Sequence, residues 1–207
     1  MRILLLPLII TILALVFKHN ADKRDHSDQH SVRSYLNRES AANSVRRQDI
    51  SNLPYIQAPI ESFPFDITLN DAKKQLQIDN YKKEILSYAG KPMLNLIGVT
   101  NTELKEHYGP ANLDVLSIYD QNYNQYMRYL FLYAQAIYEE YPVKSADLLT
   151  YCISTGTDIS GIYELLGRYY KEKGDLTAFN KLYEVIPDTN SVSGKMILNK
   201  LDHLKEI

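Results

Sequence analysis

The stretch Tyr163–Pro187, YELLGRYYKEKGDLTAFNKLYEVIP, decides the fold because it holds two amphipathic segments on either side of a tight turn. Apolar side chains recur at helical spacing in both segments: Leu165, Leu166, Tyr169 and Tyr170, then Leu176, Phe179, Leu182, Tyr183 and Ile186. Gly174 suits the left-handed position that ends a helix, and Asp175 can cap the next one. Glycine inside a helix is unfavourable, so Gly167 indicates that a neighbouring helix comes close. The stretch therefore predicts an antiparallel helical hairpin.

This hairpin resembles a tetratricopeptide repeat. The matching features are Tyr163, the Leu166-Gly167 pair, Tyr170, the Gly174-Asp175 turn and Tyr183. Phe179 departs from the pattern, because the family places a small residue there, and Pro187 comes several residues early. About one repeat length upstream, a weaker copy aligns Leu130 with Tyr163, Tyr133 with Leu166, Ala134 with Gly167, Ile137 with Tyr170 and Ala146 with Phe179. The alternative is a generic helical hairpin that uses the same turn chemistry.

The resemblance implies an all-α fold, a short solenoid of antiparallel helical hairpins that binds a protein or peptide. Partners of this family usually lie along the concave side, which is lined by the first helix of each pair. Carried onto this sequence, the lining positions are Arg128, Gln135, Tyr138, Glu164, Arg168 and Lys171. These residues flank the apolar stripes, which also predicts their exposure. Because three of them are cationic, the expected ligand is an acidic segment or a free C-terminus, and the alternative is a solvated face without a ligand.

The N-terminus predicts a membrane anchor. Residues 3–17 are apolar except for Pro7 and Thr11, slightly fewer than the roughly 20 residues that usually span a bilayer. No small-residue cleavage site follows Phe17, so we interpret residues 1–18 as an uncleaved transmembrane anchor and keep a cleaved signal peptide as the alternative. Lysine and arginine are more frequent after this segment than before it, which places the C-terminal domain in the cytoplasm.

Three segments follow the anchor. Residues 19–51 are polar and mixed in charge, which predicts a disordered linker with a transient helix around Val32–Leu36. Residues 52–67 carry three prolines among large apolar side chains, which predicts an extended arm lying across a helical domain. A docking peptide for another protein is the alternative for this arm. Residues 68–207 are the predicted helical domain.

Capping residues mark the helices in the first part of this domain. Thr68, with Asp71 three residues later, predicts the start of a helix that ends at a Gly-Lys-Pro sequence. Its predicted apolar face consists of Ala72, Leu76, Ile78, Tyr81, Ile85 and Tyr88. Residues 93–99 form a short apolar run that is either helix or strand. Thr100 and Glu103 complete a capping box and predict a short helix.

Residues 112–141 predict the longest helix, in which apolar side chains alternate at spacings of four and three. This stripe consists of Tyr119, Tyr123, Tyr126, Leu130, Tyr133 and Ile137. We interpret it as facing the core, with homodimerisation through the stripe as the alternative. After Pro187, either Ser191 or Ser193 predicts the cap of a final helix that covers the open end of the solenoid.

Composition and motifs argue against several classes of function. The formal charge of −2 argues against nucleic-acid binding by electrostatics. The single cysteine, Cys152, leaves no partner for an intramolecular disulfide. We interpret His26 and His30 as solvated linker side chains, not as metal ligands. No nucleophile with a nearby base, no phosphate loop and no zinc motif is present, so we expect no catalytic residues, no metal and no cofactor.

The sequence therefore predicts a single-pass, membrane-anchored adaptor that binds a protein or peptide and is not an enzyme. One alternative is an exported structural component of the cell envelope that assembles through the tyrosine-rich helix. Another is an enzyme whose active site carries no recognisable motif. The oligomeric state is not predicted.

Overall fold

The computed structural model describes residues 32–206. The predicted anchor, residues 1–18, and the first part of the predicted linker, including His26 and His30, lie outside the described residues. Within the described part the regular structure is helical and contains no β-strand, so the predicted all-α class is confirmed. None of the helices in residues 32–206 combines the length and the apolar character needed to cross a membrane.

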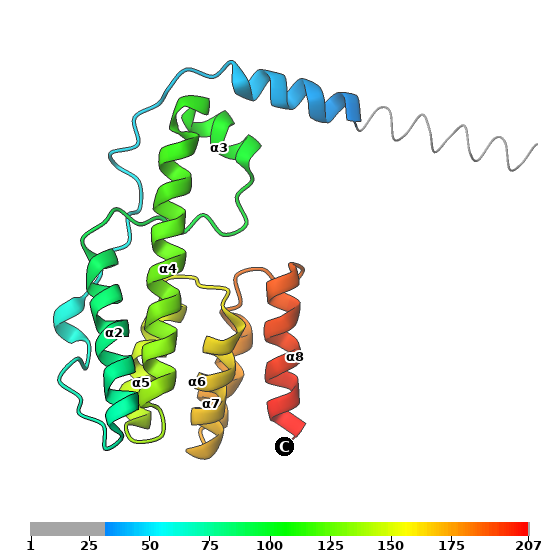
Figure 1. Cartoon of the computed structure of the whole chain (residues 1–207). Helices are drawn as coiled ribbons and strands as arrows, with labels where there is room; N and C mark the ends of the chain where they lie inside the picture. The colour runs from blue at the N-terminus through cyan, green and yellow to red at the C-terminus, as the bar shows by residue number, and fades with distance from the viewer. Residues whose placement is uncertain (1–31, 207) are drawn as a thin grey trace, which may run out of the picture. The chain divides into compact units, whose positions relative to one another are not determined.

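Figure 1 shows the order of the elements along the chain. An unlabelled helix over residues 32–43 is followed by η1 (Ile60–Ser62), α2 (Ala72–Ala89), α3 (Asn101–Tyr108), η2 (Pro110–Asn112), α4 (Leu113–Ile137), α5 (Pro142–Ser154), α6 (Ser160–Glu172), α7 (Leu176–Glu184) and α8 (Val192–Glu206). The chain divides into two compact units. Unit 1 comprises the chain up to Gln48 together with Thr100–Leu113, and unit 2 comprises Asp49–Val99 together with the chain from Asp114 onward.

Several helix ends follow from the predicted local signals. The Thr100 hydroxyl accepts the backbone N–H of Glu103 at 3.3 Å, and the Glu103 carboxylate accepts the backbone N–H of Thr100 at 2.8 Å, so the capping box of α3 is confirmed. Asp175 and Ser191 accept backbone N–H groups in the first turns of α7 and α8. Gly174 lies in the left-handed region, at φ +72°, after the end of α6.

The start of α2 differs from the prediction. Asp71, not Thr68, is the N-cap, and its side chain accepts two backbone N–H groups of the first turn. Thr68 lies outside the helix because Leu69 after it is buried, with its own backbone N–H donated to the Gln75 side chain at 2.8 Å. The tertiary burial of Leu69 therefore overrides the local signal at Thr68.

Two leucines that were predicted for apolar faces are exposed, namely Leu76 at 63% and Leu176 at 60%. Ile78 and Ile85 fix the inner face of α2, and Leu76 lies about 200° around the helix from Ile78. Leu176 is the first residue of α7, directly after the turn. The apolar run at residues 93–99 is neither helix nor strand.

Residues 52–67 pack against the helices of unit 2 without forming regular structure other than η1. Phe63 is buried in the core cluster, and Phe65 meets the ring of Tyr133 edge to face, with ring centroids 5.4 Å apart. The Tyr133 hydroxyl donates a hydrogen bond of 2.8 Å to the carbonyl of Pro64. Apolar side chains and a backbone carbonyl thus hold the arm in place.

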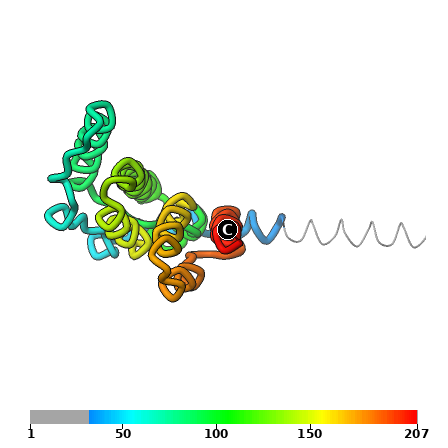
Figure 2. The backbone as a smooth tube through the Cα atoms, turned by 90° about the horizontal axis from the view of Figure 1, so that it is seen from below, coloured from blue at the N-terminus to red at the C-terminus, as the bar shows by residue number. Residues whose placement is uncertain are grey.

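The helices of unit 2 form two layers. In Figures 1 and 2, α2, α4, α6 and α8 follow one another in one row, and α5 and α7 lie in a second layer. The helix α6 contacts α5, α7 and α8. A Cβ added to Gly167 of α6 would lie 3.1 Å from Leu201 of α8 and 3.3 Å from Phe179 of α7, so the predicted close approach of a neighbouring helix is confirmed.

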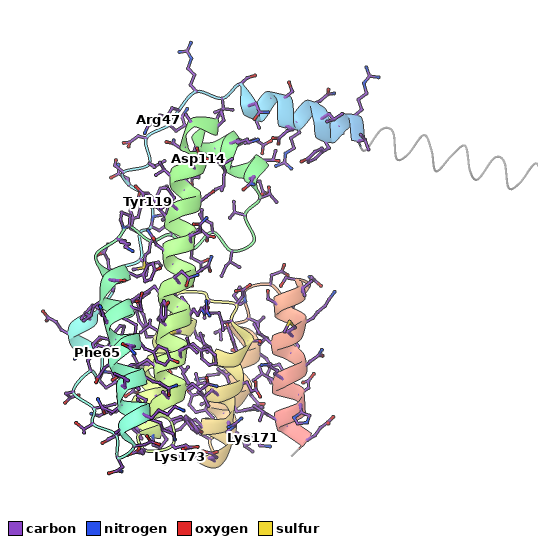
Figure 3. The ribbon with its side chains drawn as sticks, viewed as in Figure 1. Arg47, Phe65, Asp114, Tyr119, Lys171 and Lys173 are labelled. Carbon is purple, nitrogen blue, oxygen red and sulfur yellow. The ribbon has the colours of Figure 1, made fainter. Side chains whose placement is uncertain are left out.

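The tyrosine stripe of α4 faces the core. Tyr123, Tyr126 and Leu130 are fully buried, and so is Ile137. Tyr119 is partly buried, at the start of the stripe (Figure 3). The interpretation of an inward-facing stripe is therefore confirmed for its central part, and its buried tyrosines are not available for contact with a second molecule.

The described part of the predicted linker begins with a helix. Residues 32–43 form this helix, which includes the position of the predicted transient helix around Val32–Leu36 and belongs to unit 1 together with α3. Arg38 donates two hydrogen bonds of 2.7 Å to the Glu106 carboxylate, and Glu39 accepts from Thr102 at 2.8 Å and from Lys105. These contacts to α3 are not visible in the local sequence.

Candidate functional site

A cavity of about 780 Å³ lies within unit 2. It is lined by residues of α4, α6 and α8, by the turn after α4 and by the residue before α6. Phe131, Ile159 and Leu165 form its apolar part. Its charged rim consists of Glu139, Glu164, Arg168, Glu172 and Lys200. A concave surface that joins apolar side chains to a few placed charges is the usual form of a binding site.

The close packing of α4 and α6 shapes the bottom of this cavity. A Cβ on Gly161 would lie 2.5 Å from the ring of Phe131, a distance that real Cβ atoms do not adopt. Glycine at the first turn of α6 therefore lets that helix approach the aromatic ring on α4. The start of α6 is also fixed by Tyr163, whose hydroxyl donates a hydrogen bond of 3.0 Å to the carbonyl of Thr157.

Two of the glutamates at the cavity are already neutralised by lysines. Lys200 lies 2.6 Å from the Glu164 carboxylate, and Lys74 lies 2.8 Å from the Glu139 carboxylate. Arg168 is exposed and makes no ion pair with any residue in the described range 32–206. Its guanidinium is therefore the cationic group at the cavity that a ligand carboxylate could bind in bidentate fashion.

The third glutamate is held by a buried tyrosine. The Tyr138 hydroxyl donates a hydrogen bond of 2.8 Å to Glu172. Burial and the neighbouring carboxylate raise the pKa of Tyr138 above its ordinary value, so this hydroxyl stays a donor at neutral pH. The contact joins the turn after α4 to the last residue of α6 and so fixes one end of the cavity.

Four of the six residues predicted to line a groove do line this cavity, namely Gln135, Tyr138, Glu164 and Arg168. Arg128 and Lys171 do not line it. Arg128 lies seven residues before Gln135 on α4, hence on nearly the same face but about 10 Å farther along the axis. The amino group of Lys171 donates to the carbonyl of Leu204 near the end of α8.

Other lining residues were not found from the sequence. Lys200 comes from α8, which the repeat pattern gave only a covering role, and the contact between α6 and α8 brings it to the rim. Phe131 and Leu165 are apolar and were not considered as part of a polar groove. The Lys200–Glu164 pair has no signal at sequence level, because the two residues are 36 positions apart.

The described residues offer little for catalysis. Cys152 is fully buried, and burial raises the pKa of its thiol well above the ordinary value, which keeps it in the unreactive protonated form. Residues 32–206 hold no group of three or more histidine, cysteine or acidic side chains placed to bind a metal ion. Within the described residues, the cavity combines apolar side chains with one guanidinium that makes no ion pair.

Comparison of the chain with protein-family models, with curated proteins and with solved structures finds no match.

Proposed function

We propose that this chain is a membrane-anchored, non-enzymatic adaptor that binds a protein or peptide in the cavity lined by α4, α6 and α8. The observation that carries the proposal is the exposed, unpaired guanidinium of Arg168 beside an apolar floor that includes Phe131 and Leu165. An arginine in such a place binds one carboxylate with geometric specificity, while apolar side chains of the ligand cover the floor.

The charges around the cavity favour a ligand with a single carboxylate. Lys200 is already paired with Glu164, so Arg168 is the one cationic residue among the described residues lining the cavity that is left for a ligand carboxylate. A run of acidic side chains would find no second cation among these residues, and Glu172 would repel it. A free C-terminus places one carboxylate on Arg168, and an apolar side chain of its last residue packs against Phe131 and Leu165. Of the two predicted ligand classes, the free C-terminus is therefore the one that we propose.

The likeness to tetratricopeptide repeats is part of the proposal. Two consecutive antiparallel hairpins, α4 with α5 and α6 with α7, are followed by α8. Of the five position pairs that the repeat alignment equates, four are buried in both hairpins: Leu130 and Tyr163, Tyr133 and Leu166, Ala134 and Gly167, Ala146 and Phe179. In the fifth pair, Ile137 is buried and Tyr170 is partly buried. This common burial supports the repeat register, and the proposed groove is lined by the first helix of each pair.

The membrane part of the proposal rests on the composition of residues 1–18, with the two units on the cytoplasmic side. The apolar run supports insertion, and the excess of lysine and arginine after it supports this orientation. A test is flotation of the full chain with membrane vesicles, followed by digestion of intact cells from outside. The proposal expects the chain to float with the vesicles and both units to be protected from the external protease.

Site-specific photo-crosslinking tests the binding surface. A photoreactive amino acid at Gln135, which lines the cavity, is expected to crosslink the full-length chain to another protein in intact cells. The matched control carries the same group at Asp114, an exposed position near the other end of α4 (Figure 3). A crosslink at Gln135 that disappears in an Arg168→Glu background supports the groove. Equal crosslinking at both positions, or none at Gln135, refutes it.

A further inference from the structure

The first turn of the helix over residues 32–43 exposes three apolar side chains. Val32, Tyr35 and Leu36 are 56%, 59% and 58% exposed. Their positions i, i+3 and i+4 place them on one face of the helix. Apolar side chains on one helix face, left in water next to each other, mark a surface that meets something apolar.

The remainder of the same helix is fixed within unit 1. Arg38 holds Glu106 of α3 in a bidentate contact, and Glu39 binds Thr102 of the same helix. Ala42 is fully buried. The exposed turn precedes, in the same helix, the residues that are attached to α3, so its apolar face keeps a defined direction within unit 1.

Among the described residues, one free cationic side chain lies beside this apolar face. Arg33 is in the same turn, is exposed and makes no ion pair with another described residue. Arg38, farther along the helix, is paired with Glu106. An anionic lipid headgroup complements Arg33, because an arginine beside a short apolar face is typical of helices that lie in a membrane interface.

The chain length keeps this helix near the proposed anchor. Residues 18–31 separate the apolar run from Val32, and a fully extended segment of that length spans about 50 Å at most. A tether of this length holds the helix at an effective concentration on the order of millimolar near the bilayer, so a weak contact is enough to populate the bound state.

From these observations, and resting on the proposed anchor, we propose that the face of Val32, Tyr35 and Leu36 lies in the headgroup region of the membrane that holds residues 1–18. The neighbouring Arg33 contacts an anionic headgroup. This contact places unit 1 at the membrane surface, which the anchor alone does not require.

The absence of tryptophan from the sequence gives a direct test. Tyr35→Trp introduces a single tryptophan into the full chain, which is reconstituted in vesicles containing phosphatidylglycerol. Emission is expected to shift to shorter wavelength and to lose intensity when the lipids carry bromine near the headgroup. Leu36→Trp provides a second reporter on the same face, should Tyr35→Trp perturb folding.

The matched control is Asn37→Trp, which lies about 200° around the helix from Tyr35 and is exposed. Its emission is expected to stay that of a solvated tryptophan and to resist quenching. Substituting Arg33 by glutamine in the Tyr35→Trp chain is expected to weaken the quenching, which then depends less on salt.

The possible failures are distinguishable by flotation of the same vesicles. If the chain does not float with the vesicles, the anchor is wrong and this inference falls with it. If the chain floats but reporters at 35 and 36 are not quenched, the anchor stands and the inference is wrong. A blue shift that grows with protein density but not with brominated lipid indicates a second copy of the chain on this face, which also overturns it.

Discussion

The two units differ in what holds them together. In unit 2, large aromatic side chains such as Tyr126 and Tyr163 are fully buried, and apolar contacts continue from α2 to α8. In unit 1, the helix over residues 32–43 is attached to α3 by ion pairs with partly exposed side chains, among them Arg38 and Glu106. Burial of apolar surface is not screened by salt, whereas exposed ion pairs are weak and screened. The difference predicts that unit 2 is the more stable unit. It also predicts that, in unit 1, the helix over residues 32–43 separates from α3 more easily.

The largest effect is expected from the interior of unit 2. Leu130 is fully buried in α4, so Leu130→Ala should lower the free energy of unfolding by roughly 2–5 kcal/mol, because it removes buried apolar surface and leaves a cavity. The matched control is Leu76→Ala, since Leu76 is 63% exposed and should change little. Denaturant unfolding of the full chain in detergent measures both. Similar effects at the two positions would contradict an interior built around α4.

A smaller effect is expected from two buried tyrosine hydroxyls. Tyr133→Phe loses the hydrogen bond to the Pro64 carbonyl and should cost about 1 kcal/mol. The Tyr126 hydroxyl is buried without a partner in the described structure, so Tyr126→Phe should be neutral or stabilising. Unfolding of the two variants under the same conditions separates these outcomes. A larger loss for Tyr126→Phe than for Tyr133→Phe would mean that the Tyr126 hydroxyl has a partner.

The smallest effect is expected in unit 1, and it depends on pH. The hydrogen bonds from Arg38 hold the pKa of Glu106 below its usual range, and those from Lys105 and Thr102 do the same for Glu39. Because the folded-state pKa values are lowered, this stabilisation is complete above the ordinary glutamate pKa of about 4.3 and is lost as the pH falls through the lower folded values.

Amide-resolved NMR of the full chain is the measurement. As the pH falls below about 4.3, signals of residues 32–43 and α3 should change before those of α4 and α6. Arg38→Gln should shift the change to higher pH, toward the ordinary glutamate value, because Glu106 loses its partner. Simultaneous change of both units would show that these ion pairs do not hold unit 1 independently.

Local signals explain which helix ends could be predicted from the sequence. The capping box of Thr100 and Glu103 uses atoms three residues apart, so the local sequence contains all that is needed. Thr68 carries a similar signal, but the helix start predicted at Thr68 is wrong, because the burial of Leu69 fixes the backbone in another conformation. The same limit explains why only a transient helix was predicted around Val32–Leu36, since the partners of residues 32–43 lie on α3, over 60 positions away.

Helix periodicity predicts which residues of the candidate site are exposed. Gln135 and Arg168 lie beside the apolar stripes of their helices, and that position alone predicts their exposure. Periodicity does not say how far along a helix a cavity extends, so it did not separate Arg128 from Gln135. It also did not find Lys200, which reaches the rim through the packing of α8 on α6.

The affinity of two arginine variants tests the groove most directly. With the protein captured by crosslinking at Gln135, binding of the full chain is compared for Arg168→Ala and Arg128→Ala. Loss of a charge-assisted contact of about 1.5–3 kcal/mol should weaken binding about 10- to 100-fold in Arg168→Ala. Arg128→Ala should bind as the unchanged chain does, because Arg128 does not line the cavity. Unchanged affinity in Arg168→Ala, or an equal loss in both variants, would contradict the assignment of this cavity as the binding site.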